Sequence, residues 1–168
     1  MPLPTISFLI VDDHPISRSI AVEALRAVGV TRLKVAEDGG VAFGLLQTEV
    51  PDIAIVDVNM PIDGMHLLKM VRRSPSSPVP MLPMNMLTAY TDQRRILALR
   101  DAGATEVVSK PVSIATLFRR IASTIDNPLP FIHSDTFVGP DRRRRSDARY
   151  QGPRRRSSDF DSYEIDVA

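Results

Sequence analysis

Residues 8–13 read FLIVDD, four apolar residues followed by two aspartates. A short continuous apolar run is typical of a strand that is covered on both faces, as in parallel sheets. Residues 53–57, IAIVD, repeat the arrangement. Weaker runs at residues 33–36, 84–87 and 107–108 complete five expected strands. These runs predict a sheet in which carboxylates stand at the ends of two strands.

Segments with helical spacing separate and follow these strands. They lie within residues 16–28, 41–46, 67–71, 96–102 and 113–125. In each segment apolar residues recur every three or four positions, and Ser113 can cap the last helix. Fivefold alternation of strand and helix predicts an α/β fold, a doubly wound parallel sheet with helices on both faces. Ligands of such sheets bind outside the carboxyl ends of the strands.

The composition excludes several classes of protein. The chain has 168 residues, of which 43% are hydrophobic and 24% charged, so most of it can bury a core. It contains no cysteine, which excludes disulfides, thiolate metal sites and a cysteine nucleophile. No apolar run approaches the roughly 18 residues that span a bilayer, and no signal peptide is visible. We therefore expect a cytoplasmic protein without membrane insertion.

Five polar side chains stand at the expected strand ends: Asp12, Asp13, Asp57, Thr88 and Lys110. A single aspartate after a strand is most often a turn or cap residue, so only the presence of all five residues at strand ends indicates a functional site. Three clustered carboxylates repel one another, and a hard divalent cation such as Mg²⁺ relieves that repulsion. A carboxylate beside Mg²⁺ and a lysine is placed to attack a phosphoryl group. The Thr88 hydroxyl can then bond a phosphoryl oxygen.

Four segments resemble the receiver domains of two-component response regulators: residues 10–15 (IVDDHP), 56–61 (VDVNMP), 87–89 (LTA) and 109–111 (SKP). The resemblance covers residues 5–127 and is nearest to stand-alone, chemotaxis-regulator-like receivers. It implies a flavodoxin-like five-stranded parallel sheet of order 2-1-3-4-5 with five helices. It also implies a signalling phosphoprotein rather than an enzyme, with slow self-dephosphorylation.

The resemblance implies roles for the strand-end residues. Asp57 would accept a phosphoryl group from a sensor histidine kinase or a histidine phosphotransfer protein, and Lys110 and Thr88 would contact that group. Mg²⁺ would be held by the carboxylates of Asp12, Asp13 and Asp57 and the backbone carbonyl of Asn59. The Lys110–Pro111 bond would be cis. Phosphohydrolases of similar chemistry place a second carboxylate where this chain has Asn59, which argues against a hydrolase.

Three features depart from the family pattern. The loop of residues 60–64 is one residue shorter than usual, which alters access to the site. Val107 stands where the family has a Tyr or Phe that turns inward on activation, so that switch is absent or rebuilt. Asn85 interrupts an apolar strand and needs buried hydrogen-bond partners. Tyr90 is expected near the site, and His14 is expected to cap a helix.

Charge is distributed unevenly along the chain. Residues 1–127 carry 13 basic and 13 acidic residues, whereas residues 139–158 carry eight arginines and two aspartates. The last ten residues carry four acids and no base. We expect residues 128–168 to form a Pro/Arg-rich, largely irregular extension that is flexible or docks on a partner.

A repeated unit within this extension leaves three interpretations open. Residues 137–147 and 150–159 each contain an aromatic residue, Gly-Pro, an arginine cluster, serine and aspartate. The extension is a solvated tail, docks on an acidic protein surface or as an autoinhibitory cover on this chain's own carboxylate-rich edge, or binds an anion such as a cyclic dinucleotide (cyclic di-GMP) or nucleic acid. The candidate anion-binding residues are Arg142, Arg143, Arg144, Arg145, Arg154, Arg155 and Arg156. Output would pass to an unidentified protein, for example of the motility or chemotaxis machinery; alternatively, the receiver would gate ligand binding by this extension.

Overall fold

A five-stranded parallel sheet of order β2-β1-β3-β4-β5 forms the centre of the protein. The computed structural model describes residues 5–61, 63–89, 92–134 and 136–141. The strands are β1 (Ser7–Val11), β2 (Arg32–Ala36), β3 (Ile53–Asp57), β4 (Met84–Thr88) and β5 (Glu106–Ser109). This order confirms the predicted flavodoxin-like fold, and each strand includes the apolar run from which it was predicted.

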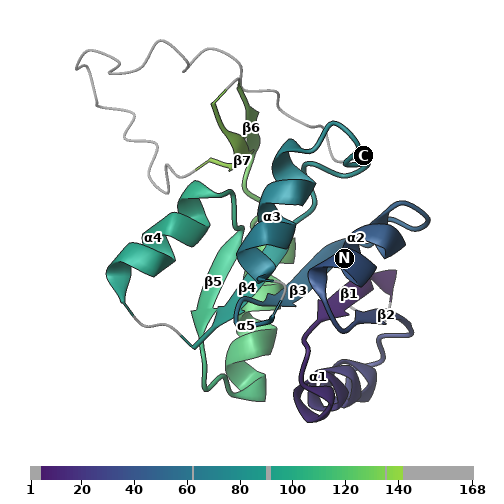
Figure 1. The fold of residues 1–168 in the computed structure, drawn as a ribbon. Coiled ribbons are helices and arrows are strands. Elements are labelled where there is room, and N and C mark those ends of the chain that lie inside the picture. Colours follow the sequence, from purple (N-terminus) through teal and green to yellow (C-terminus); the bar gives the residue numbers. More distant parts are fainter. Residues whose placement is uncertain (1–4, 62, 90–91, 135, 142–168) are drawn as a thin grey trace.

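Five helices cover the two faces of the sheet (Figure 1). They are α1 (Pro15–Ala27), α2 (Gly39–Leu46), α3 (Gly64–Arg73), α4 (Gln93–Asp101) and α5 (Ile114–Asp126). Helices α2, α3 and α4 contribute to one hydrophobic cluster and α1 and α5 to the other. Each helix is preceded by a side chain that accepts a backbone N–H of its first turn, and Ser113 caps α5 as predicted. In the described part of the chain, no helix combines the length and apolar character needed to cross a membrane.

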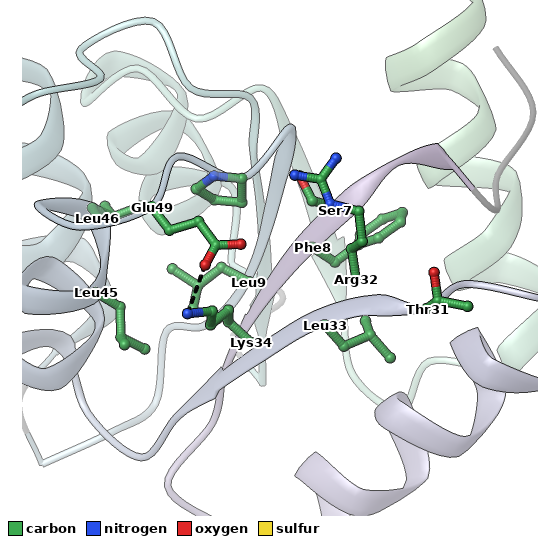
Figure 2. A pocket seen from close by; sticks show the side chains of 11 residues that line it. Ser7, Phe8, Leu9, Thr31, Arg32, Leu33, Lys34, Leu45, Leu46 and Glu49 are labelled. Carbon is green, nitrogen blue, oxygen red and sulfur yellow. Dashed lines mark ion pairs between the residues drawn. The ribbon is translucent and has the colours of Figure 1, made fainter.

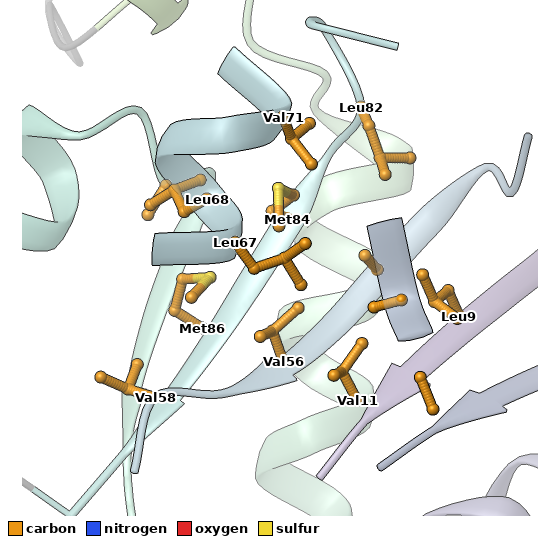
Figure 3. Packing of buried hydrophobic residues seen from close by; sticks show 14 of the residues in the cluster. Leu9, Val11, Val56, Val58, Leu67, Leu68, Val71, Leu82, Met84 and Met86 are labelled. Atoms are coloured by element: carbon orange, nitrogen blue, oxygen red, sulfur yellow. The ribbon is translucent and has the colours of Figure 1, made fainter. Parts of the chain in front are cut away.

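Helix α3 packs through a continuous apolar stripe. Leu67, Leu68 and Val71 are almost fully buried, as their predicted helical spacing requires. Figure 3 shows these side chains over Met84 and Met86 of β4 and their neighbours on β3. Complete burial of such a side chain contributes about 1.5–3 kcal/mol, so α3 is held firmly on the sheet.

The buried amide of Asn85 in β4 finds one of the hydrogen-bond partners that its position requires. Its Oδ1 accepts a hydrogen bond of 3.1 Å from the Thr124 hydroxyl of α5. Its Nδ2 is buried and has no partner among the described residues. Beside it, Arg120 of α5 lies 3.2 Å from Glu106 of β5. Polar contacts therefore supplement the apolar contacts between α5 and the sheet.

Helix α1 forms as predicted but exposes most of its predicted apolar stripe. Ile16, Ile20 and Val28 are exposed, at 65%, 55% and 39%, whereas Ala24 is buried. The helix packs through Ala24 and Leu25 instead. An exposed apolar row on a surface helix is a feature that packing within this domain does not explain.

A short antiparallel hairpin follows α5, formed by β6 (Phe131–His133) and β7 (Val138–Pro140). The sequence pattern did not predict it, because each strand has only three residues. The hairpin lies beside the carboxyl end of α3 (Figure 1). Arg73 of α3 donates through Nη2 to the Thr136 carbonyl at 3.1 Å. The division into a domain of residues 5–127 and an extension of residues 128–168 stays a prediction.

One edge of the sheet is formed by β2, beside a small hollow of about 170 Å³ (Figure 2), and the other by β5. Lys34 of β2 and Glu49 form an ion pair of 2.7 Å across this hollow. The hydrogen bond from Lys34 lowers the pKa of the Glu49 carboxyl below its usual value. Both side chains are about half exposed, so the pair contributes little to stability.

Candidate functional site

Three carboxylates converge at the carboxyl ends of β1 and β3. One oxygen each from Asp12, Asp13 and Asp57 lies within 4.8 Å of the others. This proximity follows from topology, because Val11 of β1 is paired with Val56 of β3 and the next residues are Asp12 and Asp57. Asp12 and Asp57 are buried, and Asp13 is exposed. The cluster is thus open to solvent on one side only.

Lys110 provides the positive charge beside this cluster. Its Nζ lies 2.8 Å from Asp57 Oδ2 and 3.5 Å from Asp12 Oδ2. Partial burial disfavours the charged ammonium, but hydrogen bonds and charge attraction from Asp57 and Asp12 outweigh this effect and raise the pKa of Lys110. Lys110 is therefore a cation at neutral pH. The Lys110–Pro111 bond is cis, as the resemblance implied.

Backbone amides fix the two buried carboxylates in position. Asp12 Oδ1 accepts from the backbone N–H of His14 at 2.8 Å, and Asp57 Oδ1 accepts from that of Asn59 at 3.1 Å. Each carboxylate thus uses one oxygen for a backbone amide and the other for Lys110. This leaves little freedom for either side chain to rotate, which is the pre-organisation that a charged reaction centre needs.

Thr88 and Asn59 complete the edge of the site. Thr88 ends β4, between the strands that carry Asp57 and Lys110, and is fully buried. Asn59 Oδ1 accepts from the backbone N–H of Ala89 at 2.9 Å. This bond ties the loop after β3 to the loop after β4, the two loops on either side of Asp57.

The chemistry of these donors fits a hard divalent cation. The clustered groups offer only oxygen atoms, and carboxylate and carbonyl oxygens are the ligands that Mg²⁺ takes in proteins. A 2+ ion would also offset a local excess of negative charge, since three carboxylates face one described ammonium. The arrangement is suited to phosphoryl chemistry, where a carboxylate, a metal ion and a lysine act together.

The structure brings together Asp12, Asp13, Asp57, Thr88 and Lys110, the five residues expected at the strand ends. Val107 is partly buried and packs against the cluster beneath α2, α3 and α4. His14 caps α1 by accepting from the Ser17 N–H, as expected. Tyr90 and the arginines from Arg142 to Arg156 lie outside the described residues, so the predictions for them stay predictions.

Sequence reasoning missed two side chains that support the site. Arg18 of α1 donates through Nη1 to the backbone carbonyl of Asp12 at 2.6 Å. The Asn59 amide makes the bond to Ala89 given above. The position of Arg18, one turn inside a helix that begins beside two aspartates, was the available signal.

An apolar groove of about 510 Å³ opens directly beside the carboxylates. It lies between α1 and α5 and is lined by Asp12 and Lys110 at one end. Ile20 and Ile114, both about half exposed, also line it. Of the exposed apolar residues of α1, Ile20 therefore borders the groove.

The model of the response regulator receiver domain matches residues 8–122. The chain belongs to this family. Receiver domains of two-component response regulators act as phosphoacceptors, and the carboxylate edge described above is where this chain carries the family's motifs. The chemotaxis protein CheY-3 of Vibrio cholerae is 33% identical over 114 residues, which cover 67% of this chain and 86% of that protein.

Other similar proteins place the same domain in different settings. The sensor histidine kinase RcsC of Salmonella typhimurium is 34% identical over 115 residues, 68% of this chain but only 12% of the kinase. A putative response regulator of Chloroflexus aurantiacus superimposes with a TM-score of 0.65 at 32% identity, covering 73% of this chain and 98% of that one. Vibrio cholerae CheY4 gives a TM-score of 0.63 at 31% identity, covering 69% and 95%.

Proposed function

We propose that this receiver is the phosphoacceptor of a two-component phosphorelay and that Asp57 is the residue phosphorylated. The observation that carries the proposal is the position of the Asp57 carboxylate, buried at a strand end with Lys110 Nζ 2.8 Å away. A structural ion pair would not need the further carboxylates of Asp12 and Asp13 beside it, because their repulsion is a cost. Function explains that cost if a cation and a phosphoryl group occupy the site.

The reaction is a transfer of a phosphoryl group from a histidine. A carboxylate oxygen of Asp57 attacks phosphorus, the P–N bond of the phosphohistidine breaks, and an acyl phosphate forms. The departing imidazole nitrogen retains the electron pair of the broken bond. Lys110 neutralises charge on the phosphoryl oxygens, and the Thr88 hydroxyl can bond one of them.

The carboxylates of Asp12, Asp13 and Asp57 and the backbone carbonyl of Asn59 would hold Mg²⁺. When bound, the ion supplies positive charge to the phosphoryl oxygens and so lowers the barrier to transfer. The amide bonds to Asp12 and Asp57 keep both carboxylates directed toward the same space before the ion or donor arrives.

The phosphodonor docks on the groove between α1 and α5. A partner that brings a histidine to Asp57 must cover the open side of the carboxylate cluster, and the groove ends at Asp12 and Lys110. Its lining includes the exposed side chains of Ile20 and Ile114. Such an apolar lining suits a helical histidine kinase or phosphotransfer protein with an apolar face.

Output by protein contact, through the receiver surface or the arginine-rich extension, is part of the proposal. The alternative is that the extension binds a cyclic dinucleotide or nucleic acid under control of the receiver. Arg142 and the following arginines lie outside the described residues, and this alternative rests on their sequence alone.

Phosphorylation of the full chain by radiolabelled phosphoramidate, with Mg²⁺ or with a chelator, tests the proposal. We expect Mg²⁺-dependent labelling of the wild type and only background labelling of Asp57→Asn. Asp126→Asn changes an exposed aspartate at the end of α5 in the same way and should be labelled like the wild type. Equal labelling of Asp57→Asn and wild type would exclude Asp57 as the acceptor.

A further inference from the structure

Helix α3 begins against the backbone of Asp57. A β-carbon built on Gly64, its first residue, would overlap the Asp57 carbonyl oxygen, so only glycine allows this approach. The Gly64 N–H also donates to the Val58 carbonyl at 3.3 Å. Helix α3 is therefore in direct contact with the segment that carries Asp57. A shift of that segment must move α3 or break this contact.

The body of α3 transmits a displacement rather than absorbing it. Leu67, Leu68 and Val71 are buried against the sheet, and the helix is ten residues long, about 15 Å. Close-packed side chains have no free space in which to deform, so movement at one end reaches the other. Figure 3 shows this stripe seated on β4 and β3.

The far end of α3 holds the hairpin through two successive arginines. Arg72 is 2% exposed and donates through Nε to the Gly103 carbonyl at 3.0 Å and through Nη1 to the Pro80 carbonyl at 2.9 Å. Its guanidinium carbon lies 5.1 Å from the centre of the Phe131 ring in β6. Arg73 donates to the carbonyl between the hairpin strands. The same helix that touches Asp57 thus carries β6 and β7.

The hairpin touches the domain through backbone as well as through side chains. Gly103, with a φ of +99°, lies so close to β7 that a β-carbon on it would be 2.5 Å from the Val138 carbonyl oxygen. A β-carbon on Gly139 would be 2.7 Å from the Gly103 Cα. An added methyl group at either glycine would therefore force a shift between the hairpin and the domain.

The contact between Arg72 and the hairpin combines a favourable ring contact with an unfavourable burial of charge. Among the described residues, Arg72 pairs with no carboxylate, and its Nη2 is buried without a hydrogen-bond partner. Burial lowers the pKa of Arg72, because the charged guanidinium has lost water. The cation–π contact with the ring of Phe131 offsets part of this cost. Undocking the hairpin would remove the Phe131 ring from Arg72 and leave its hydrogen bonds to Gly103 and Pro80 in place.

We propose that α3 couples the phosphorylation state of Asp57 to docking of the β6–β7 hairpin, with phosphorylation favouring the undocked state. The inference rests on the proposed function. Strand β7 ends at Pro140, two residues before Arg142, so the hairpin is the last described element before the arginine-rich segment in sequence. Docked and undocked hairpins are the two states that such coupling requires.

Hydrogen exchange of the full chain, with Mg²⁺ and with or without beryllofluoride as the phosphoryl mimic, tests the coupling directly. The amides of Ser134 and Asp141 donate within the hairpin, to the Phe137 and Pro130 carbonyls. We expect beryllofluoride to speed exchange of the hairpin amides at least about fivefold, the lower end of typical coupling between sites. If beryllofluoride changes the exchange rates of the amides of Asp57 and Ala89 but not those of the hairpin amides, the inference is overturned and the proposed function stands.

A second, independent test uses the reciprocity of coupling: if beryllofluoride at Asp57 weakens hairpin docking, then weakened docking must raise the affinity for beryllofluoride. Phe131→Ala and Gly139→Ala weaken docking and should each raise the apparent beryllofluoride affinity, by about the factor seen in exchange. Phe118→Ala, which removes a partly buried ring of α5 on the other face of the sheet, is the matched control and should not. Wild-type affinity in both hairpin variants contradicts the coupling. Failure of the wild type to bind beryllofluoride contradicts the proposed function and, with it, this inference.

Discussion

The two ends of the parallel sheet each hold a partly or fully buried cation, and the two cations have different partners. At the carboxyl ends, Lys110 lies between Asp57 and Asp12, in a cluster open to solvent on one side. At the amino ends, Arg72 is enclosed by two backbone carbonyls and an aromatic ring. Lys110 can exchange its partners when an ion or phosphoryl group arrives. Arg72 cannot do so without moving a piece of the fold.

The charged side chains around Lys110 form a site suited to a reaction, whereas the hydrogen bonds from Arg72 to backbone carbonyls hold parts of the fold together. Pre-organised donors and acceptors at the carboxyl ends cost stability, because like charges are held close together. The contacts of Arg72 join segments far apart in sequence, namely α3, the loop before β4, the loop before β5 and the hairpin.

The largest loss of stability is expected from a substitution at Gly64, where the start of α3 lies against the backbone of Asp57. Gly64→Ala places a methyl group on the Asp57 carbonyl, and overpacking of this kind costs about 3 kcal/mol. Gly44→Ala in α2 meets nothing within 4 Å and should instead stabilise the protein by about 0.5–1 kcal/mol. Urea unfolding of both variants measures the difference. Equal stabilities would mean that the contact between α3 and Asp57 is not tight.

The two cations should respond differently to Mg²⁺. Arg72→Met leaves two carbonyls without their donor and should cost about 2–3 kcal/mol in the free energy of unfolding. Lys110→Met leaves the carboxylates without their cation and should cost about 1 kcal/mol. Millimolar Mg²⁺ should restore most of the loss in Lys110→Met and none in Arg72→Met. If Mg²⁺ restored the stability of both variants, or of neither, Lys110 and Arg72 would not differ in the way proposed.

The smallest effect concerns pH. The pKa of Lys110 is raised in the folded protein, so its pairing stabilises the fold fully below the unfolded value of about 10.4. That contribution is lost as the pH rises through the higher folded value. The difference in unfolding free energy between wild type and Lys110→Met should be constant from about pH 7 to 9 and shrink above about 10.4. If the difference in unfolding free energy between wild type and Lys110→Met grew above about pH 10.4, it would contradict the raised pKa of Lys110.

The sheet and the carboxylate edge were predictable because their signals are local. A buried strand is visible as an apolar run, and the residue after the run stands at the edge, so Asp12, Asp57 and Lys110 were found from sequence alone. The exposed face of α1 was not predictable, because Ile16 and Ile20 have the spacing of a buried stripe. Periodicity reports which residues share a face but not what covers that face.

Arg72 and the hairpin had no local signal. In sequence Arg72 is one of two arginines at the end of a helix, where basic residues are common on the surface. Its burial depends on Gly103 and Phe131, which lie 31 and 59 positions away. The three-residue strands of the hairpin are too short for an alternating pattern to be recognised.

The outer strand β2 limits how this protein can meet others. Its Arg32, Lys34 and Val35 are exposed, and Lys34 is paired with Glu49 beside the strand (Figure 2). Charged side chains on an edge strand disfavour the addition of a further strand, and with it sheet-to-sheet aggregation. At this edge, recognition is thereby left to helices and grooves rather than to an added strand. A binding surface made of helices can be repositioned by small rigid shifts, whereas an added strand would have fixed the sheet in one arrangement.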